Sequence, residues 1–327
     1  MKYRHISKAV EETIQYISDR REGKQLPLYT TKSKLNKAID GFSWGRIYTL
    51  CGLSGSGKSI TIEELKRDLI DCNKTQNFDI LSFEFEMLAI DQITRNISGK
   101  TEKSVNELYS ANKEYLDSET FEQAVKATEI LTKYPIYYVD EIGTVNEIKS
   151  TILSFLDEHN ANKDRGLVVT IDHVLLTRGM SGQAEKEVVD QLMHTCVELK
   201  KSLTSAGYKI MFILLSQLNR EIEKQERVLN PMFHFPTKND IFAASSVYYC
   251  SDVVLILHKP AIIEGLGGYY GPPRKGYPKG LPIFTQNQEA FIYWHIIKSR
   301  FGSNQILIML DDFVHSRVLE YSANSSN

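Results

Sequence analysis

The chain has 327 residues, of which 42% are hydrophobic and 24% charged, and its formal net charge is −2. This composition predicts a folded protein with one large or two smaller α/β domains, and it excludes a globally basic surface. No apolar run reaches the roughly 18 residues of a membrane span, and the charged N-terminus excludes a signal peptide. The four cysteines form no C-x-x-C pair, which favours a reducing compartment such as the cytosol of a bacterium or of a virus-infected cell.

Residues 5–22 show the periodicity of an amphipathic helix, whose apolar stripe is Ile6, Val10, Ile14 and Ile17. Gly23 and Pro27 then end the helical pattern. A helix ahead of a domain must bury its stripe somewhere. Packing on its own domain and docking on a neighbouring copy both stay open at this point.

A glycine-rich segment follows the apolar run 47–51 and precedes a helical pattern, and it reads G-x-x-x-x-G-K-S. This is a P-loop in its strand–loop–helix context, whose backbone N–H groups and helix N-terminus cradle phosphates. Lys58 would reach the β- and γ-phosphates, and the Ser59 hydroxyl would bind Mg²⁺. The nucleotide-binding candidates are Gly52, Ser54, Gly55, Ser56, Gly57, Lys58 and Ser59.

Three later strands end in polar residues, where open α/β sheets place their ligands. The first strand begins at Asp79 and leads to Glu84 and Glu86. The second, 166–172, ends in Asp172, as a Walker B strand does when its carboxylate holds the Mg²⁺ shell. The third, 210–215, leads into Gln217 and Arg220. Helices are expected between these strands, including one that a capping box opens at Thr144.

The segments 173–185 and 221–240 follow two of these strands as loops, and the second is expected to be mobile. Basic and aromatic residues in such loops can hold a single nucleic acid strand. On local evidence alone, a surface loop of mixed charge is favoured for 221–240, which also carries three glutamates. The DNA-binding candidates are Arg178, Gly179, Arg220, Lys224, Arg227 and Lys238.

The last third contains strands at 252–257 and 291–297, and an antiparallel partner at 305–310. Residues 260–288 are rich in Gly, Pro and Lys and are expected to be an excursion without elements of its own. The chain is therefore predicted to be α/β, with a mostly parallel central sheet, helices on both faces and a preceding amphipathic linker helix.

The motifs resemble the C-terminal motor domain of DnaB-type replicative helicases, which has a RecA-like P-loop NTPase fold. Besides the P-loop, the resemblance rests on blocks 82–87, similar to F-S-L-E-M, and 169–173, similar to the Walker B block with His173 in place of Tyr. Residues 215–220 match S-Q-L-N-R, and 298–302 are similar to K-x-R-x-G. The order of these blocks after a P-loop makes the match specific.

The resemblance implies a role for each block. Glu86, rather than Glu84, takes the place of the catalytic glutamate, and Gln217 that of the γ-phosphate sensor. Lys298 and Arg300 take the place of the lysine and arginine finger that act on the ATP of the neighbouring subunit. It further implies a linker helix at 1–27 that docks on the next protomer, a RecA-like ATPase domain at 28–327, ATP and Mg²⁺ as cofactors, a hexamer and single-stranded DNA.

The family's N-terminal collar domain has no counterpart here, so a short form of the kind that a phage encodes is expected, with a primase or loader partner left open. In 240–245, Phe242 and Ala243 stand where the family has Arg and Glu. Two other functions remain as alternatives: a RecA-like strand-exchange or regulatory ATPase, and a non-catalytic scaffold that loads another motor.

Overall fold

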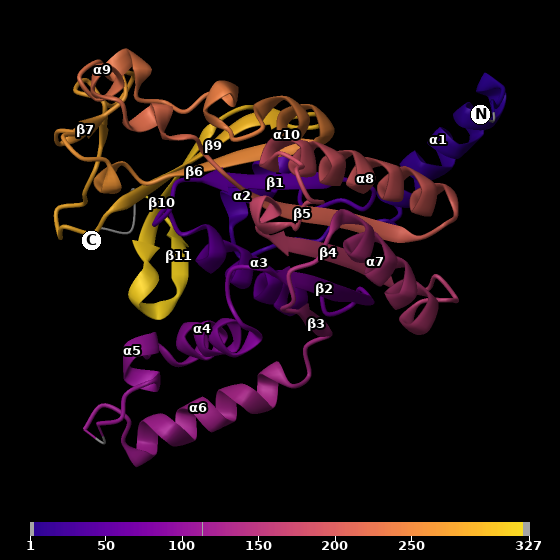
Figure 1. The fold of residues 1–327 in the computed structure, drawn as a ribbon, viewed down its shortest axis with the longest axis horizontal. Helices are drawn as coiled ribbons and strands as arrows, with labels where there is room; N and C mark the ends of the chain where they lie inside the picture. Colours follow the sequence, from indigo (N-terminus) through magenta and orange to yellow (C-terminus); the bar gives the residue numbers. More distant parts are fainter. Residues whose placement is uncertain (1–2, 113, 323–327) are drawn as a thin grey trace.

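A twisted sheet forms the centre of the molecule (Figure 1), and the computed structural model describes residues 3–112 and 114–322. Within these residues the strand order of the main sheet is β11-β10-β9-β6-β1-β5-β4-β2-β3. The six strands from β6 to β3 run parallel, whereas β9, β10 and β11 add an antiparallel end. The strands are β1 (Ile47–Gly52), β2 (Phe78–Glu84), β3 (Ile136–Val139), β4 (Gly166–Asp172), β5 (Lys209–Gln217), β6 (Val253–His258), β9 (Phe291–Ser299), β10 (Ile306–Asp312) and β11 (Arg317–Glu320).

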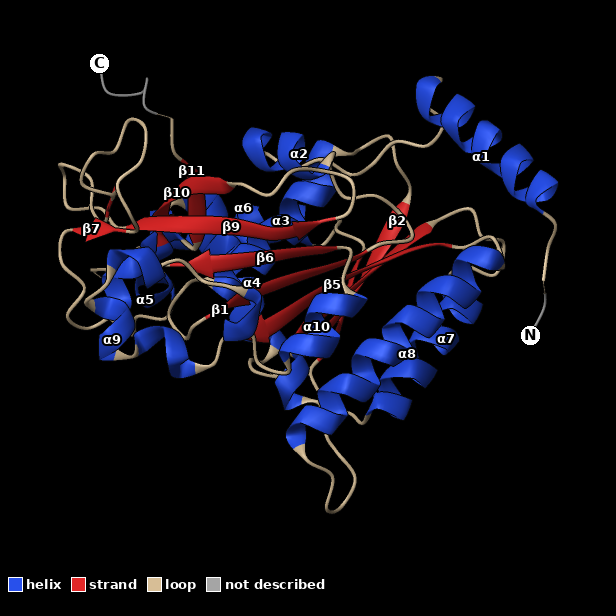
Figure 2. Ribbon diagram, turned by 90° about the horizontal axis from the view of Figure 1, so that it is seen from above, coloured by secondary structure: helices blue, strands red, loops and turns tan. Residues whose placement is uncertain are grey.

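Helices cover both faces of this sheet (Figure 2), because its central strands are apolar on both sides. One core lies between the sheet and α7, α8 and α10, and the other lies between the sheet and α2 and α3. The helices are α1 (Ile6–Arg21), α2 (Ser33–Ile39), α3 (Lys58–Cys72), α4 (Ala89–Thr101), α5 (Val105–Leu108), α6 (Ser118–Leu131), α7 (Val145–His159), α8 (Glu185–Ser205), α9 (Gln225–Val228) and α10 (Ala244–Cys250). The predicted α/β class and the parallel sheet are confirmed.

Helix α1 projects from the body of the molecule in both views. None of its residues is buried, and Ile6, Val10, Ile14 and Ile17 are each more than half exposed. The predicted helix is therefore present, but within the described part of this chain its apolar stripe has no cover. In the same part of the chain, no helix is long and apolar enough to cross a membrane.

Two expectations about irregular segments need correction. Residues 221–240, expected as a loop, contain short helical elements at Arg220–Glu223, Gln225–Val228, Pro231–Phe233 and Lys238–Asp240. Residues 260–288 contain a helical turn and a small antiparallel pair, β7 (Tyr269–Tyr270) and β8 (Leu281–Pro282). Both segments lack long apolar periodicity, so only their tertiary contacts reveal their order.

Candidate functional site

The P-loop joins the carboxyl end of β1 to the first turn of α3, and two of its glycines are structurally required. Gly57 has φ 87° as it opens the helix, a conformation that favours glycine. At Gly52 a Cβ atom would lie 2.3 Å from the Ser56 hydroxyl oxygen and 2.8 Å from the Leu257 carbonyl oxygen. The loop can therefore keep this shape only with glycine at both positions.

Lys58 folds back over this loop. Its Nζ donates hydrogen bonds to the carbonyl oxygens of Gly52, at 3.0 Å, and Leu53, at 2.9 Å. Burial lowers the pKa of Lys58, while the charges of Asp172 and Glu86 raise it. The ammonium group thus contacts the loop carbonyls and is attracted by the charges of two carboxylates, at the position where a P-loop lysine meets phosphate oxygens.

Asp172, at the end of β4, lacks the partners that a buried carboxylate normally has. The residue is 2% exposed, and neither carboxylate oxygen makes a hydrogen bond within the described residues. Burial, followed by the charge of Glu84, raises the pKa of Asp172 to about 7, and the nearby Ser59 hydroxyl opposes this shift. A carboxylate and a hydroxyl with free oxygen lone pairs fit a Mg²⁺ ion.

The two glutamates of the 82–87 block have different surroundings. Glu84 is buried and accepts hydrogen bonds from Lys66 Nζ and Gln92 Nε2, both at 2.8 Å. Lys66 is also paired with Glu63, so these charges form a closed cluster beneath the site. The Glu86 side chain is 50% exposed, and its Oε2 lies 3.9 Å from His173 Nε2. Of the two, Glu86 is the one whose carboxylate is free to contact an incoming water molecule.

Gln217 ends β5 and lies beside the P-loop, level with Gly52 of β1. The Leu218 N–H donates to the Gly52 carbonyl at 3.3 Å, and the Phe242 N–H donates to the Gln217 carbonyl at 2.9 Å. The segment 218–242 therefore leaves the sheet and returns to it at the same strand end. Both ends of this segment are therefore hydrogen bonded at Gln217 or at the adjacent Gly52.

Lys298 and Arg300 lie beside the amino ends of the parallel strands (the amino edge), opposite to the P-loop. Since β9 is antiparallel to β6, Ser299 is level with Val253 and, through it, with Tyr48 near the start of β1. Four residues of β1, about 13 Å, separate that level from Gly52. Both side chains point away from the P-loop: Lys298 Nζ donates to the Tyr248 carbonyl at 2.5 Å, and Arg300 contacts Asp252 at 3.3 Å. They cannot reach the P-loop of their own chain.

The DNA-binding candidates follow β4 and β5. They therefore lie at the carboxyl ends of the parallel strands (the carboxyl edge), where the P-loop also lies. Arg178, next to Gly179, donates to Glu147 at 2.9 Å, whereas Arg220 and Lys238 are exposed. Lys224 is exposed and pairs with Glu221 at 2.6 Å. Arg227 differs from the others: its guanidinium pairs with Asp240 and donates to the Phe233 and Phe235 carbonyls, so it holds the segment together.

Phe313 was not expected from the sequence as a site residue. It follows β10, and its ring lies so close to Gly57 that a Cβ there would be 2.2 Å from the ring. Lys259 Nζ lies 4.5 Å from the centre of the same ring. No local motif marks this aromatic residue, because only the order of the sheet brings β10 to the P-loop.

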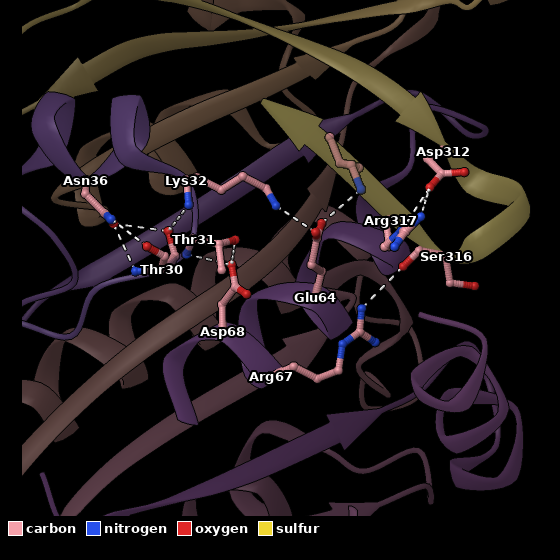
Figure 3. A network of polar contacts seen from close by, with 11 residues as sticks. Thr30, Thr31, Lys32, Asn36, Glu64, Arg67, Asp68, Asp312, Ser316 and Arg317 are labelled. Atoms are coloured by element: carbon pink, nitrogen blue, oxygen red, sulfur yellow. Dashed lines mark hydrogen bonds and ion pairs between the residues drawn. The ribbon is translucent and has the colours of Figure 1, made fainter. Parts of the chain in front are cut away.

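A polar network ties α3 to both ends of the domain (Figure 3). Glu64 accepts from Lys32 Nζ at 2.6 Å and from the Val318 N–H at 3.0 Å. One turn later, Asp68 accepts from the Thr31 hydroxyl at 2.6 Å. The segment after α1 and the hairpin that carries Phe313 are therefore both fixed to the P-loop helix.

This arrangement agrees with the comparison to known families. The model of the DnaB-like helicase C-terminal domain matches residues 28–305. The chain belongs to this family. Among curated proteins, none matches this chain.

Two solved structures show the same fold. One, described as an ATPase domain, has a TM-score of 0.74 and 15% identity, over 96% of this chain and 99% of that one. A DnaB-like replicative helicase, described with its interactions with primase, has a TM-score of 0.75 and 14% identity, over 98% of this chain and 68% of that one. Membership of the DnaB-like family supports a replicative helicase and accounts for the RecA-like sheet.

Proposed function

We propose that this DnaB-like chain is the motor of a replicative DNA helicase, which hydrolyses ATP between the subunits of a hexameric ring and moves along single-stranded DNA. One observation carries the proposal: Lys298 and Arg300 lie at the edge of the sheet opposite to their own P-loop. A finger that cannot act within its own chain can act on the nucleotide of a neighbour. The ring then completes each site with two subunits.

In this mechanism the P-loop and Lys58 bind the triphosphate of ATP. Ser59 and Asp172 would hold Mg²⁺, which neutralises phosphate charge when bound. Glu86 orients a water molecule and accepts its proton, since its carboxylate is half exposed and its contact with His173 is a long one, at 3.9 Å. Lys298 and Arg300 of one subunit stabilise charge on the γ-phosphate in the next, an effect typically of about 10³–10⁵ in rate.

A change in the bound nucleotide would be transmitted to DNA through Gln217. The Phe242 N–H at one end of segment 218–242 is hydrogen bonded to Gln217, and the Leu218 N–H at the other end is hydrogen bonded to Gly52. Arg178, Arg220, Lys224 and Lys238 are exposed cations of the two carboxyl-edge segments, and we assign DNA contact to them and to the Gly179 backbone. Arg227 contributes by fixing the shape of its segment.

The exposed stripe of α1 supports ring closure, since a neighbouring subunit could bury it. We place the protein in the cytosol of a bacterium or of a phage-infected cell, where replication occurs. A primase or a loader remains a predicted partner.

The test is to measure ATP hydrolysis with and without single-stranded DNA, unwinding of a tailed fork, and particle mass with nucleotide. The proposal expects hexamers, DNA-stimulated hydrolysis and unwinding, with hydrolysis and unwinding both lost in Glu86→Gln. Open filaments that pair strands without unwinding would favour a RecA-like exchange protein. A rate of ATP hydrolysis that is the same with and without single-stranded DNA would contradict the helicase function.

A further inference from the structure

A buried group of aromatic rings lies where segment 260–288 meets the main sheet. Its centre is Tyr270 of β7, which is buried together with His258, the last residue of β6, and His295 of β9. The Tyr270 hydroxyl lies 2.6 Å from His258 Nδ1 and 2.8 Å from His295 Nε2. None of these residues belongs to the nucleotide or DNA contacts described above.

The hydroxyl bridges two neutral imidazoles. A phenol has one proton, so it donates to one ring nitrogen and accepts from the N–H of the other. Burial lowers the pKa of His258 to about 3 and that of His295 well below its usual value, and both rings therefore stay uncharged. Removal of the hydroxyl alone would leave two buried ring nitrogens without their partner.

The same excursion also holds the segment between Gln217 and Phe242. The Gly271 N–H donates to His234 Nδ1 at 3.0 Å, and His234 Nε2 lies 2.9 Å from the Val228 carbonyl. The His234 ring is nearly parallel to that of Tyr270, at 12° and 6.1 Å. Phe235 packs against Gly271 so closely that a Cβ there would lie 2.0 Å from its ring.

Tyr270 therefore touches elements with three separate tasks. His258 follows Leu257, whose carbonyl oxygen packs against Gly52 of the P-loop. His295 lies on β9, the strand that leads to Lys298 and Arg300. His234 and Phe235 belong to the segment assigned to DNA contact.

We propose that Tyr270 is a positioning residue that holds the 220–240 segment on the sheet, and that the 260–288 excursion serves to place Tyr270 at this position. In this role it sets how strongly DNA stimulates ATP hydrolysis, while leaving hydrolysis without DNA unchanged. The link to DNA rests on the proposed function, whereas the positioning of the segment does not.

The test compares Tyr270→Phe with Tyr293→Phe. Tyr293 lies in the same aromatic cluster, but its hydroxyl donates to the Pro282 carbonyl and not to a histidine. Amide hydrogen exchange in 220–240 should be about tenfold faster in Tyr270→Phe and unchanged in Tyr293→Phe. The DNA concentration for half-maximal stimulation should rise on the order of fivefold in Tyr270→Phe. Its rate without DNA and its KM for ATP should match those of wild type.

A second variant, His234→Ala, cuts the link from the segment side and should reproduce both effects if Tyr270→Phe fails to fold. Unchanged exchange and unchanged DNA response in a folded Tyr270→Phe protein would overturn the inference. A wild-type protein without DNA stimulation would instead contradict the proposed function. In that case faster exchange in Tyr270→Phe would still support the positioning role, and unchanged exchange would end it.

Discussion

The two edges of the parallel strands carry functional groups of different kinds. At the carboxyl edge, Lys58 and Asp172 are buried, their pKa values are displaced, and Asp172 lacks hydrogen-bond partners among the described residues. At the amino edge, Lys298 and Arg300 are partly exposed and lean on backbone carbonyls of α10. In the proposed function, the first edge supplies a binding site without a finger, and the second supplies a finger without a binding site. On that proposal, each subunit contains two halves of a site that it cannot join by itself, because they lie at opposite ends of the parallel strands.

The largest effect is expected at the carboxyl edge, from Glu86→Gln. The loss of the carboxylate removes the proposed proton acceptor, so kcat should fall by about 10²–10⁴ while nucleotide binding is kept. Steady-state hydrolysis and equilibrium binding of a fluorescent nucleotide measure the two quantities. Glu84→Gln is the control: it should lower the free energy of unfolding through its buried partners Lys66 and Gln92. A loss of kcat in Glu84→Gln with Glu86→Gln still active would reverse the assignment.

The buried charges under this edge should make it sensitive to Lys66→Met. Lys66 neutralises Glu63 and Glu84, and without it both carboxylates are left uncompensated. The free energy of unfolding should fall by about 3–5 kcal/mol, as a urea titration would show. Lys24→Met, which breaks an exposed pair with Glu22, should leave the urea midpoint unchanged. Equal midpoints for the two variants would mean that the buried cluster contributes nothing.

The histidines beside Tyr270 should make the fold sensitive to acid. His258 stays neutral down to a pKa of about 3, because it is buried and faces the charge of Arg227, whereas the unfolded chain takes up a proton near pH 6.5. Below about 6.5 the unfolded state binds more protons, so stability falls as the pH falls, by up to about 1.4 kcal/mol per pH unit. With respect to His258, the free energy of unfolding is thus greatest above about pH 6.5.

Asp172 acts in the opposite direction, since its raised pKa of about 7 favours the protonated folded state as the pH falls. Urea titrations of wild type and His258→Asn at about pH 7, 6 and 5 would isolate the histidine. The variant should show a shallower loss of stability below the ordinary histidine pKa. Parallel slopes would contradict the neutral state of His258.

The smallest effect is expected from Phe313→Ala. The ring packs on Gly57 and Lys259, next to the nucleotide site, and its contacts are those of one aromatic surface. KM for ATP should rise by about two- to tenfold, with kcat unchanged. Phe301→Ala, an exposed aromatic near the finger, is the matched control and should leave KM unchanged. A fall in kcat with constant KM would place Phe313 in the chemistry and not in binding.

The sequence was sufficient for the features that local patterns encode. The apolar strands, the P-loop, the capping box at Thr144 and the amphipathic α1 all follow from residues close together in the chain. The motif order also led to the family. These features are the ones in which periodicity and spacing reflect backbone geometry directly.

Other features depend on contacts between distant residues and could not be predicted. The burial of Glu84 requires Lys66 from another element, and the ring of Phe313 reaches the P-loop only through the strand order. Residues 220–240 are held by Arg227–Asp240 and by the Tyr270 cluster, which a loop-like composition does not indicate. The assigned roles of Glu86, Gln217, Lys298 and Arg300 remain predictions that await measurement.

The most direct measurement of shared sites is to mix two inactive proteins. Glu86→Gln keeps the finger and Arg300→Ala keeps the binding half, so neither should hydrolyse ATP alone. If sites form between subunits, a one-to-one mixture that exchanges subunits should regain hydrolysis, with about a quarter of its sites complete. Hydrolysis that stays absent in mixed rings, or an Arg300→Ala protein that is fully active alone, would contradict the account.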